Sequence, residues 1–179
     1  MNENPQSGGS VVTPVFVEDV FLTETFLIKG RLPNKSRRLT NILEDYNRAF
    51  LQVQDATMVS LRSAEVIRTP SVMVNVKEVV FAHELVEMAG DETLRRLAAG
   101  NTKTTRIRAF YSGVVQFELA GNVETGAYES TPGSNRRYFI MQKPTLRGLD
   151  LTNPELGLLR SLDYAIVRKD KMAYVYDFS

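Results

Sequence analysis

Hydrophobic and polar residues alternate at a period of two through much of the first half of the chain, which is typical of half-buried β-strands. The alternation predicts strands within residues 11–30, 50–61 and 72–85, with a slip of the pattern near Lys77 and Glu78. Between the first two strands, apolar residues at positions i, i+3, i+4 and i+7 predict a short helix: Leu39, Ile42, Leu43 and Tyr46.

The pattern changes to a helical period after His83. An apolar stripe predicts a helix that begins near Asp91 and ends near Gly100, and its members are Leu94, Leu97 and Ala98. Residues 121–135, rich in Gly, Ser and other turn formers, predict a loop. Alternation again predicts strands beyond the helix, within residues 106–119, 137–142 and 164–178.

The order of features in the first half recurs in the second half. The segment around Ile28 corresponds to residues 91 positions later, residues 50–59 correspond to residues 88 positions later, and the strand around Phe81 corresponds to residues 93 positions later. Two copies of one supersecondary unit give such a pattern, although two unrelated β-rich stretches can also look alike. The helix at 39–46 has no counterpart, because a Gly-, Pro- and Ser-rich loop takes its place in the second half.

These patterns predict a mainly β fold of the α+β class. Two tandem small units, barrel-like or sandwich-like, would occupy residues 11–89 and 102–179, and a short linker helix would occupy residues 90–101. The polar residues 1–10 predict a flexible tail, because they cannot bury enough apolar surface to offset the entropy of ordering.

Three segments of the first half share a recognisable pattern: RLTNIL at residues 38–43, FLQVQDA at residues 50–56 and VMVNVKEVVF at residues 72–81. Through these segments, residues 20–85 resemble a family of small bacterial domains of unknown function. Its members carry R-L-[ST]-[DN]-x-L, then F-x-x-[LV]-x-[DN]-A, then a hydrophobic strand that contains V-N. The resemblance implies a compact bacterial β-domain and supplies no activity, ligand or catalytic residue.

The composition is that of an ordinary globular chain without a strong charge. Of 179 residues, 43% are hydrophobic, and 22 basic residues balance 21 acidic ones. The near-neutral balance disfavours nucleic acid as a partner, as does the lack of tryptophan and of a basic stripe interleaved with aromatics. Cysteine, a signal-peptide pattern and a membrane-spanning apolar run are all missing from the sequence, so we expect a cytoplasmic protein without a membrane span.

Candidate catalytic chemistry is sparse. The string HELVE at residues 83–87 would place His83 and Glu87 on one face of a helix, as in metal sites. His83 is the only histidine, however, and the alternation places it near a strand end, so we interpret it as a surface or strand-end residue. Neither a P-loop nor a dinucleotide-binding glycine pattern occurs. We therefore expect a non-enzymatic protein, and we assign no catalytic, cofactor-binding or metal-ligating residue.

Two arginine pairs, Arg37 with Arg38 and Arg136 with Arg137, lie in or just after turns. Forked guanidinium groups suit phosphate and carboxylate, so an anion or nucleotide site is one interpretation of these pairs. Solvated loop charges are the other interpretation.

The C-terminal segment AYVYDF, residues 173–178, carries three alternating aromatics that would share one face of a strand: Tyr174, Tyr176 and Phe178. These side chains either pack in the core of the second unit or lie at an exposed edge that recruits a strand from a neighbour. Both can hold, because a terminal strand is often an edge strand.

The leading hypothesis for function is a structural or adaptor subunit of a larger protein assembly. Its partners would be other subunits or a second copy of the chain. The alternatives are an anion- or nucleotide-binding regulatory module that uses the arginine pairs, and a weak RNA- or DNA-binding small-barrel protein.

Overall fold

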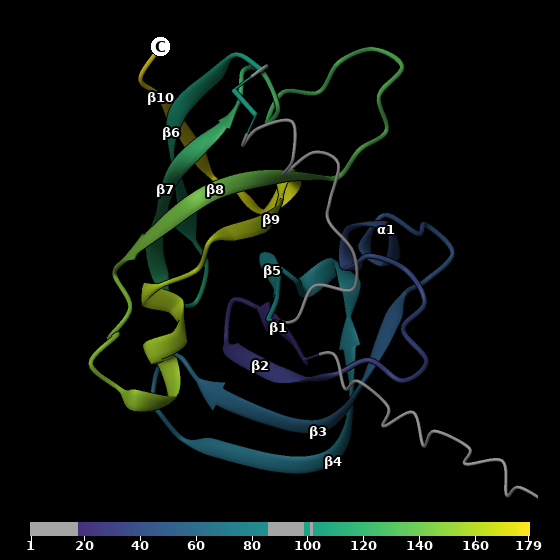
Figure 1. The fold of residues 1–179 in the computed structure, drawn as a ribbon. Helices are drawn as coiled ribbons and strands as arrows, with labels where there is room; N and C mark the ends of the chain where they lie inside the picture. Colours follow the sequence, from purple (N-terminus) through teal and green to yellow (C-terminus); the bar gives the residue numbers. More distant parts are fainter. Residues whose placement is uncertain (1–17, 86–98, 101) are drawn as a thin grey trace, which may run out of the picture.

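The computed structural model describes residues 18–85, 99–100 and 102–179. Within these residues, ten antiparallel strands form one sheet in the order β10-β6-β7-β8-β9-β5-β1-β2-β3-β4 (Figure 1). The strands are β1 (Glu18–Leu22), β2 (Phe26–Arg31), β3 (Phe50–Ser60), β4 (Val66–Asn75), β5 (Phe81–Glu84), β6 (Thr104–Ser112), β7 (Gln116–Glu124), β8 (Tyr138–Arg147), β9 (Tyr164–Arg168) and β10 (Tyr174–Asp177). Between them lie the helix α1 (Leu39–Leu43) and the 3₁₀ helices η1 (Val76–Glu78), η2 (Pro154–Arg160) and η3 (Lys169–Lys171).

The predicted mainly β class is confirmed, and the sheet is open. Among the described strands, β10 is hydrogen-bonded only to β6 and β4 only to β3, so these two strands form the edges of the sheet. The two edges lie far apart, at opposite ends of the molecule in Figure 1. The barrel-like or sandwich-like closure that the sequence predicted is therefore not confirmed.

The strand predicted within residues 11–30 is instead the hairpin of β1 and β2, and residues 11–17 lie outside the described part of the chain. The hydroxyl of Thr23 accepts a hydrogen bond from the backbone N–H of Phe26 at 2.9 Å and donates one to the Phe26 carbonyl at 3.0 Å. A threonine side chain that bonds nearby backbone groups favours a turn even within a run of β-forming residues.

The predicted helix at 39–46 is present but ends at Leu43, so Tyr46 lies beyond it. The predicted slip near Lys77 and Glu78 is the 3₁₀ helix η1, where the Asn75 side chain accepts a hydrogen bond from the Lys77 N–H at 2.9 Å. The linker helix predicted at 90–101 lies outside the described residues, apart from residues 99 and 100, and so does the tail at 1–10.

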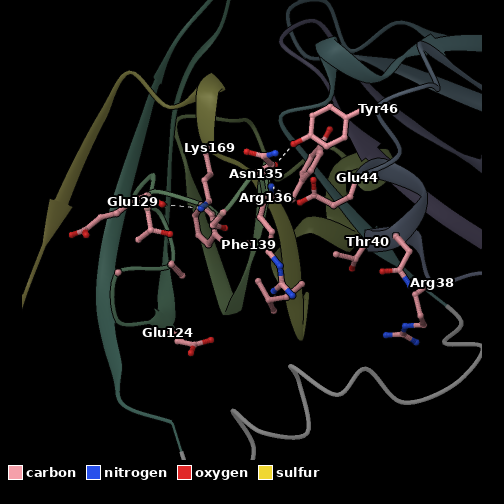
Figure 2. Close-up of a pocket in the computed structure, with 17 residues that line it drawn as sticks. Arg38, Thr40, Glu44, Tyr46, Glu124, Glu129, Asn135, Arg136, Phe139 and Lys169 are labelled. Carbon is pink, nitrogen blue, oxygen red and sulfur yellow. Dashed lines mark hydrogen bonds between the residues drawn. The ribbon is translucent and has the colours of Figure 1, made fainter.

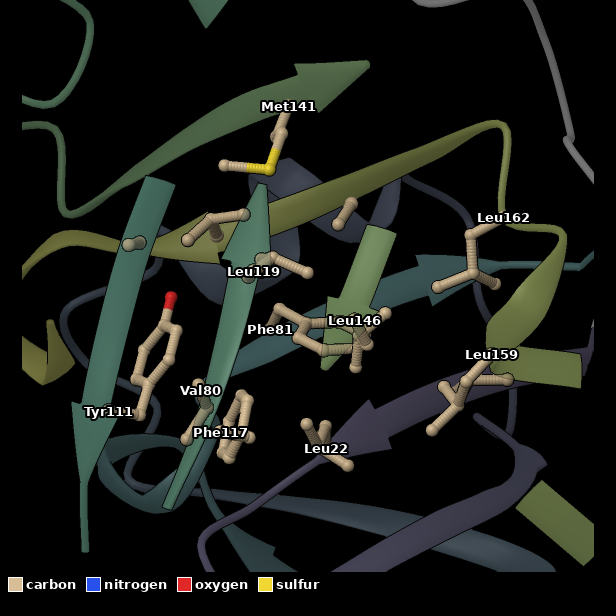
Figure 3. Close-up of a cluster of buried hydrophobic side chains, with 14 of the residues drawn as sticks. Leu22, Val80, Phe81, Tyr111, Phe117, Leu119, Met141, Leu146, Leu159 and Leu162 are labelled. Atoms are coloured by element: carbon tan, nitrogen blue, oxygen red, sulfur yellow. The ribbon is translucent and has the colours of Figure 1, made fainter. Parts of the chain in front are cut away.

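Two clusters of buried hydrophobic side chains form the core. The first, here the α1 cluster, contains Phe21, Leu39, Leu43, Leu51 and Val53 among others. The second, here the second-half cluster, is shown in Figure 3 and contains Ile107, Phe117, Leu119, Met141 and Leu146 among others. Each cluster also takes side chains from the other half: Val20, Leu22, Val80 and Phe81 join the second-half cluster, while Tyr138, Ile140, Tyr164 and Ile166 join the α1 cluster.

The two halves meet where β5 pairs with β9, which we name the internal joint. Phe81 lies opposite Val167 and Ala82 opposite Ile166. All four side chains are fully buried, and Figure 3 shows Phe81 beside Leu119 and Leu146. Burying a phenylalanine side chain stabilises a fold by about 1.5–3 kcal/mol, so the internal joint is a substantial part of the core.

The same irregularity occurs in both halves of the sheet. The register shifts at Gly30 where β2 meets β3, and at Gly121 where β7 meets β8. A Cβ atom at either glycine would lie 2.7 Å from a carbonyl oxygen, that of Gln54 or that of Gln142, so only glycine fits. The residue after each glutamine has positive φ, 49° at Asp55 and 46° at Lys143. A β-bulge of one geometry is therefore built twice.

Strand pairing in the second half follows that of the first half at constant offsets. Val20 pairs with Lys29, and Arg108, 88 positions after Val20, pairs with Ala120, 91 positions after Lys29. β3 and β8 likewise differ by 88 positions, whereas β4 and β9, η1 and η3, and β5 and β10 each differ by 93. Each half thus has the same strand order, β5-β1-β2-β3-β4 and β10-β6-β7-β8-β9.

Candidate functional site

A cleft of about 660 Å³ lies between α1 and the loop that follows β7 (Figure 2). Its walls carry three cationic and three anionic side chains: Arg38, Arg136, Lys169, Glu44, Glu124 and Glu129. The phenol of Tyr46 donates a hydrogen bond to the Asn135 carbonyl across its mouth, and this contact joins the first half to the loop. α1 and this loop occupy equivalent connections of the two halves, since α1 lies between β2 and β3 and the loop lies between β7 and β8.

Two cations of the cleft come from the second half. The Lys169 ammonium donates a hydrogen bond to the Glu129 carbonyl at 2.9 Å, and burial lowers the pKa of Lys169, with a further lowering from Arg136 that Glu44 opposes. Arg136 is exposed, and its side chain forms no hydrogen bond or ion pair within the described residues. Arg136 is therefore the cation of the cleft that is best placed to meet a ligand.

Arg137 has a structural role instead. Its guanidinium donates a hydrogen bond to the Leu43 carbonyl at 2.6 Å and lies 4.2 Å from the centre of the Tyr46 ring. The Glu44 carboxylate accepts hydrogen bonds from the backbone N–H groups of Arg137 and Tyr138, at 3.1 and 2.9 Å. These contacts fasten the end of α1 to the start of β8.

The first arginine pair is also divided. Arg38 lines the cleft, but its guanidinium lies 3.2 Å from the Glu84 carboxylate. Arg37 is exposed and lies outside the cleft. The structure thus brings Arg38 and Arg136 to one cleft and leaves Arg37 and Arg137 elsewhere.

A buried ionic cluster lies behind Arg38. The Lys35 ammonium is 2.6 Å from the Asp19 carboxylate and 2.7 Å from the Glu84 carboxylate, and these three side chains are almost fully buried. Burial raises the pKa of Asp19 to about 6, against the lowering effect of Lys35. The Glu84 carboxylate also accepts a hydrogen bond from the Leu39 N–H at 3.0 Å, so the cluster holds the start of α1 against β5. We interpret it as a structural clamp.

His83 lies near the end of β5, as the alternation predicted, but it is buried rather than at the surface. Its ring lies 4.7 Å from the ring of Tyr164. Because His83 and Glu84 are neighbours in a strand, their side chains point to opposite faces of the sheet. No group of three or more metal-ligating side chains was found in the part of the chain that the structure describes.

The C-terminal edge of the sheet is apolar and exposed. Tyr174, Tyr176 and Phe178 are 72%, 59% and 49% exposed, so of the two alternatives for these side chains the structure has the exposed edge rather than the core. The other face of β10 is anchored, because Val175 packs against the second-half cluster and Asp177 accepts hydrogen bonds of 2.6 Å from both Thr105 and Tyr128. These bonds lower the pKa of Asp177 to about 2.

The opposite edge of the sheet is similar in character. Phe50, Ile67 and Met73, on β3 and β4, are 50%, 40% and 58% exposed. Beside them lies a groove of about 320 Å³ with an apolar floor, formed by Phe26, Ile28, Met58, Val72 and Val74. Sequence reasoning found the C-terminal aromatics but missed this edge, since β4 alternates like any half-buried strand.

In comparisons with protein-family models, curated proteins and solved structures, none matched this chain. The resemblance of residues 20–85 to a bacterial domain family stays a prediction. Within the described residues, no helix has the length and apolar character needed to cross a membrane.

Proposed function

We propose that the protein is a non-enzymatic structural subunit that joins a larger protein assembly through the two edges of its sheet. The observation that carries the proposal is that both edges are open and apolar. Six of the exposed large hydrophobic side chains lie along or beside them: Phe50, Ile67, Met73, Tyr174, Tyr176 and Phe178. Open edges offer unpaired backbone N–H and C=O groups, and natural proteins commonly protect such edges with charges or proline when no partner covers them. β4 carries Arg68 and Pro70, but both precede its apolar stretch at residues 72–74.

We also propose that the subunit arose from two tandem copies of one small β-unit. The support is the strand order, the offsets of 88, 91, 88, 93 and 93 positions between the five equivalent strands of the two halves, and the bulge built twice at Gly30 and Gly121. Chance similarity of two β-rich stretches would not be expected to reproduce the register of every strand pair.

The structural role can be tested by measuring the mass of the complexes that contain the protein in the cells that produce it. A tagged chain, isolated gently and measured by native mass spectrometry, is expected in complexes much heavier than the 20.2 kDa chain. The exposed-edge variant Tyr174→Lys is expected to shift the protein to lighter species, whereas Val114→Lys, at an exposed hairpin site away from both edges, is not. A 20.2 kDa monomer throughout contradicts the proposal.

A second candidate function is anion binding in the cleft, and the observation that favours it is the Arg136 side chain without a partner among the described residues. Calorimetric titration with inorganic phosphate and with ATP tests this candidate. Arg136→Ala should abolish any binding, while Arg37→Ala, outside the cleft, should leave it unchanged. Equal binding by the two variants contradicts a site at Arg136.

A further inference from the structure

We infer that the partner at the sheet edges is a second copy of this chain, with β10 of one copy paired antiparallel to β4 of the next. The inference rests on the proposed structural function and gives it a partner and a register. Tyr174 would lie opposite Val74, and Val175 opposite Met73. The internal joint is a precedent within one chain, because β5 and β9, the equivalents of β10 and β4, already pair there.

The internal joint is the template for the register. β5 and β10 occupy equivalent places in the two halves, and so do β9 and β4, each pair at an offset of 93 positions. Within the chain, β5 pairs with β9 through Phe81 with Val167 and Ala82 with Ile166. Replacing each of these residues by the one 93 positions away in the other half pairs Tyr174 with Val74 and Val175 with Met73.

The exposed edge residues are the equivalents of residues that the internal joint buries. Phe81, Tyr138 and Ile166 are at most 2% exposed. Their equivalents Tyr174, Phe50 and Met73 are 72%, 50% and 58% exposed. The two free edges therefore carry large apolar side chains at positions that the joint buries, on complementary strands.

The apolar floor of the groove beside β4 is equivalent to the group of side chains that clusters with Phe81 in the second half. The equivalents of its apolar floor are Phe117, Leu119, Leu146, Ala165 and Val167, and all five belong with Phe81 to the second-half cluster. Tyr174, the equivalent of Phe81, is thus the side chain expected to enter the groove of the next copy. A groove of about 320 Å³ leaves room for an aromatic ring.

Charge complementarity is preserved as well. At the internal joint the Lys171 ammonium lies 3.3 Å from the Glu78 carboxylate, and these two residues occupy equivalent places in η3 and η1. Between copies, Lys171 of one chain would face Glu78 of the next, again with opposite charge. Because β10 and β4 are different surfaces, the contact is head-to-tail, and it yields a ring where the rotation closes and a filament where it does not.

Mixing two blocked variants tests both the contact and its polarity. Met73→Lys blocks one edge and Tyr174→Lys blocks the other, and both sites are exposed, so folding should persist, as thermal unfolding by circular dichroism would verify. The purified wild-type chain is expected to form species heavier than 20.2 kDa by native mass spectrometry, and each variant alone is expected to stay at 20.2 kDa. An equimolar mixture should give a dimer and nothing heavier, because each variant keeps one working edge.

Matched controls keep the result specific. Ile67→Lys lies on β4 outside the inferred register and Val114→Lys lies at the β6–β7 turn, and both should assemble like the wild type. Continued assembly of either blocked variant alone, or a mixture without dimers, overturns the inference. A purified wild-type chain that stays monomeric overturns it too, while a heavy complex in the source cells would leave the structural function standing with a different partner.

The register is tested directly by crosslinking, because the chain has no cysteine of its own. Mixed under oxidation, Met73→Cys and Val175→Cys chains should form a disulfide-linked dimer on a non-reducing gel, since directly opposite residues bring their Cβ atoms within reach. Met73→Cys with Tyr176→Cys should not, because neighbouring strand positions point to opposite faces. Equal crosslinking of the two mixtures overturns the register.

Discussion

β5 and β10 are equivalent strands with different surroundings. β5 is hydrogen-bonded on both sides, to β1 and to β9, and all four of its residues are buried. β10 is hydrogen-bonded only to β6 among the described strands, and its tyrosines are exposed. The two strands have equivalent positions and equivalent pairing with β1 and β6, so their own backbone geometry does not decide their burial. Burial depends on the second neighbour, β9, which β5 has and β10 lacks among the described strands.

The carboxylates at equivalent ends of these strands show the same contrast. Glu84 of β5 is buried with Asp19 and is bound by Lys35. Asp177 of β10 lies beside the surface and is bound by the hydroxyls of Thr105 and Tyr128. A covered strand end thus needs cations to neutralise its carboxylate, whereas an open one needs only neutral donors.

The largest expected effect is a difference in stability between alanine variants of Phe81 and Tyr174. Phe81→Ala should reduce the free energy of unfolding by about 3–5 kcal/mol, because it leaves a cavity in the second-half cluster. Tyr174→Ala should change it by no more than about 0.5 kcal/mol in the dissociated chain, because the ring is exposed. Urea unfolding at a concentration where the chain is monomeric measures both. Equal losses would show that the two strands are not differently covered.

The next effect is opposite pH dependence at the two strands. The pKa of Asp19 rises from 3.8 to about 6 on folding, so its contribution to stability is present below pH 3.8 and is lost as the pH rises through 6. A shift of this size corresponds to about 3 kcal/mol. The pKa of Asp177 falls to about 2, so its contribution is present above pH 3.8 and is lost as the pH falls toward 2.

Thermal or urea unfolding between pH 2 and pH 7 distinguishes these two groups. Relative to the wild type, Asp19→Asn should lose less stability between pH 4 and pH 7, and Asp177→Asn should lose less between pH 4 and pH 2. An effect of Asp19→Asn only between pH 2 and pH 4, or of Asp177→Asn only between pH 4 and pH 7, would contradict the assignment of the two shifts.

A smaller effect tests the equivalence of the two bulges. Gly30→Ala and Gly121→Ala should each destabilise by about 1–3 kcal/mol, because the new Cβ would lie 2.7 Å from a backbone carbonyl oxygen in both cases. Gly157→Ala is the control, since no atom lies within 4 Å of a Cβ placed there. Thermal unfolding of the three variants gives the comparison, and a harmless change at one bulge alone would show that the two are not equivalent.

The smallest effect separates the members of the second arginine pair. Arg136→Ala should change the free energy of unfolding by no more than about 0.5 kcal/mol, because its side chain is exposed and unpartnered among the described residues. Arg137→Ala should cost about 1–2 kcal/mol, because it removes the charged hydrogen bond to Leu43 and the contact with Tyr46. Urea unfolding measures the stability of both variants. Equal losses of stability would contradict the different roles of Arg136 and Arg137.

Alternation in the sequence predicted the strand-bearing stretches and the offsets between them, because local period and spacing survive any choice of neighbour. The strand ends were not predicted, since β4 begins at Val66 and β7 runs to Glu124, into the predicted loop at 121–135. The offsets of 91, 88 and 93 positions read from the sequence are the offsets of β2 to β7, β3 to β8 and β5 to β10. The Thr23 turn was missed because most of the flanking residues favour strands, and a single hydroxyl decides the turn.

The site could be predicted only in fragments. The arginine pairs were visible, but their division depends on contacts such as that of Glu44 with Arg137, which join residues 93 positions apart. The exposure of Tyr174 and Tyr176 depends on the absence of a neighbouring strand among the described residues, and β5 shows that the same place becomes core when a neighbour is present. The burial of the strands and the partners of the arginines therefore depend on long-range pairing, which the local sequence pattern does not show.

The place of β5 between β1 and β9 has a consequence during synthesis. Its partner β9 begins at Tyr164, so on the ribosome the first half is complete long before the strand that covers it emerges. Until then β5 is an open edge, with Val80 and Phe81 facing water instead of the second-half cluster. Nascent chains translated from one messenger RNA therefore expose unpaired β5 strands close to one another. Slow translation between Glu84 and Tyr164 lengthens the time in which these strands can pair between chains instead of with β9.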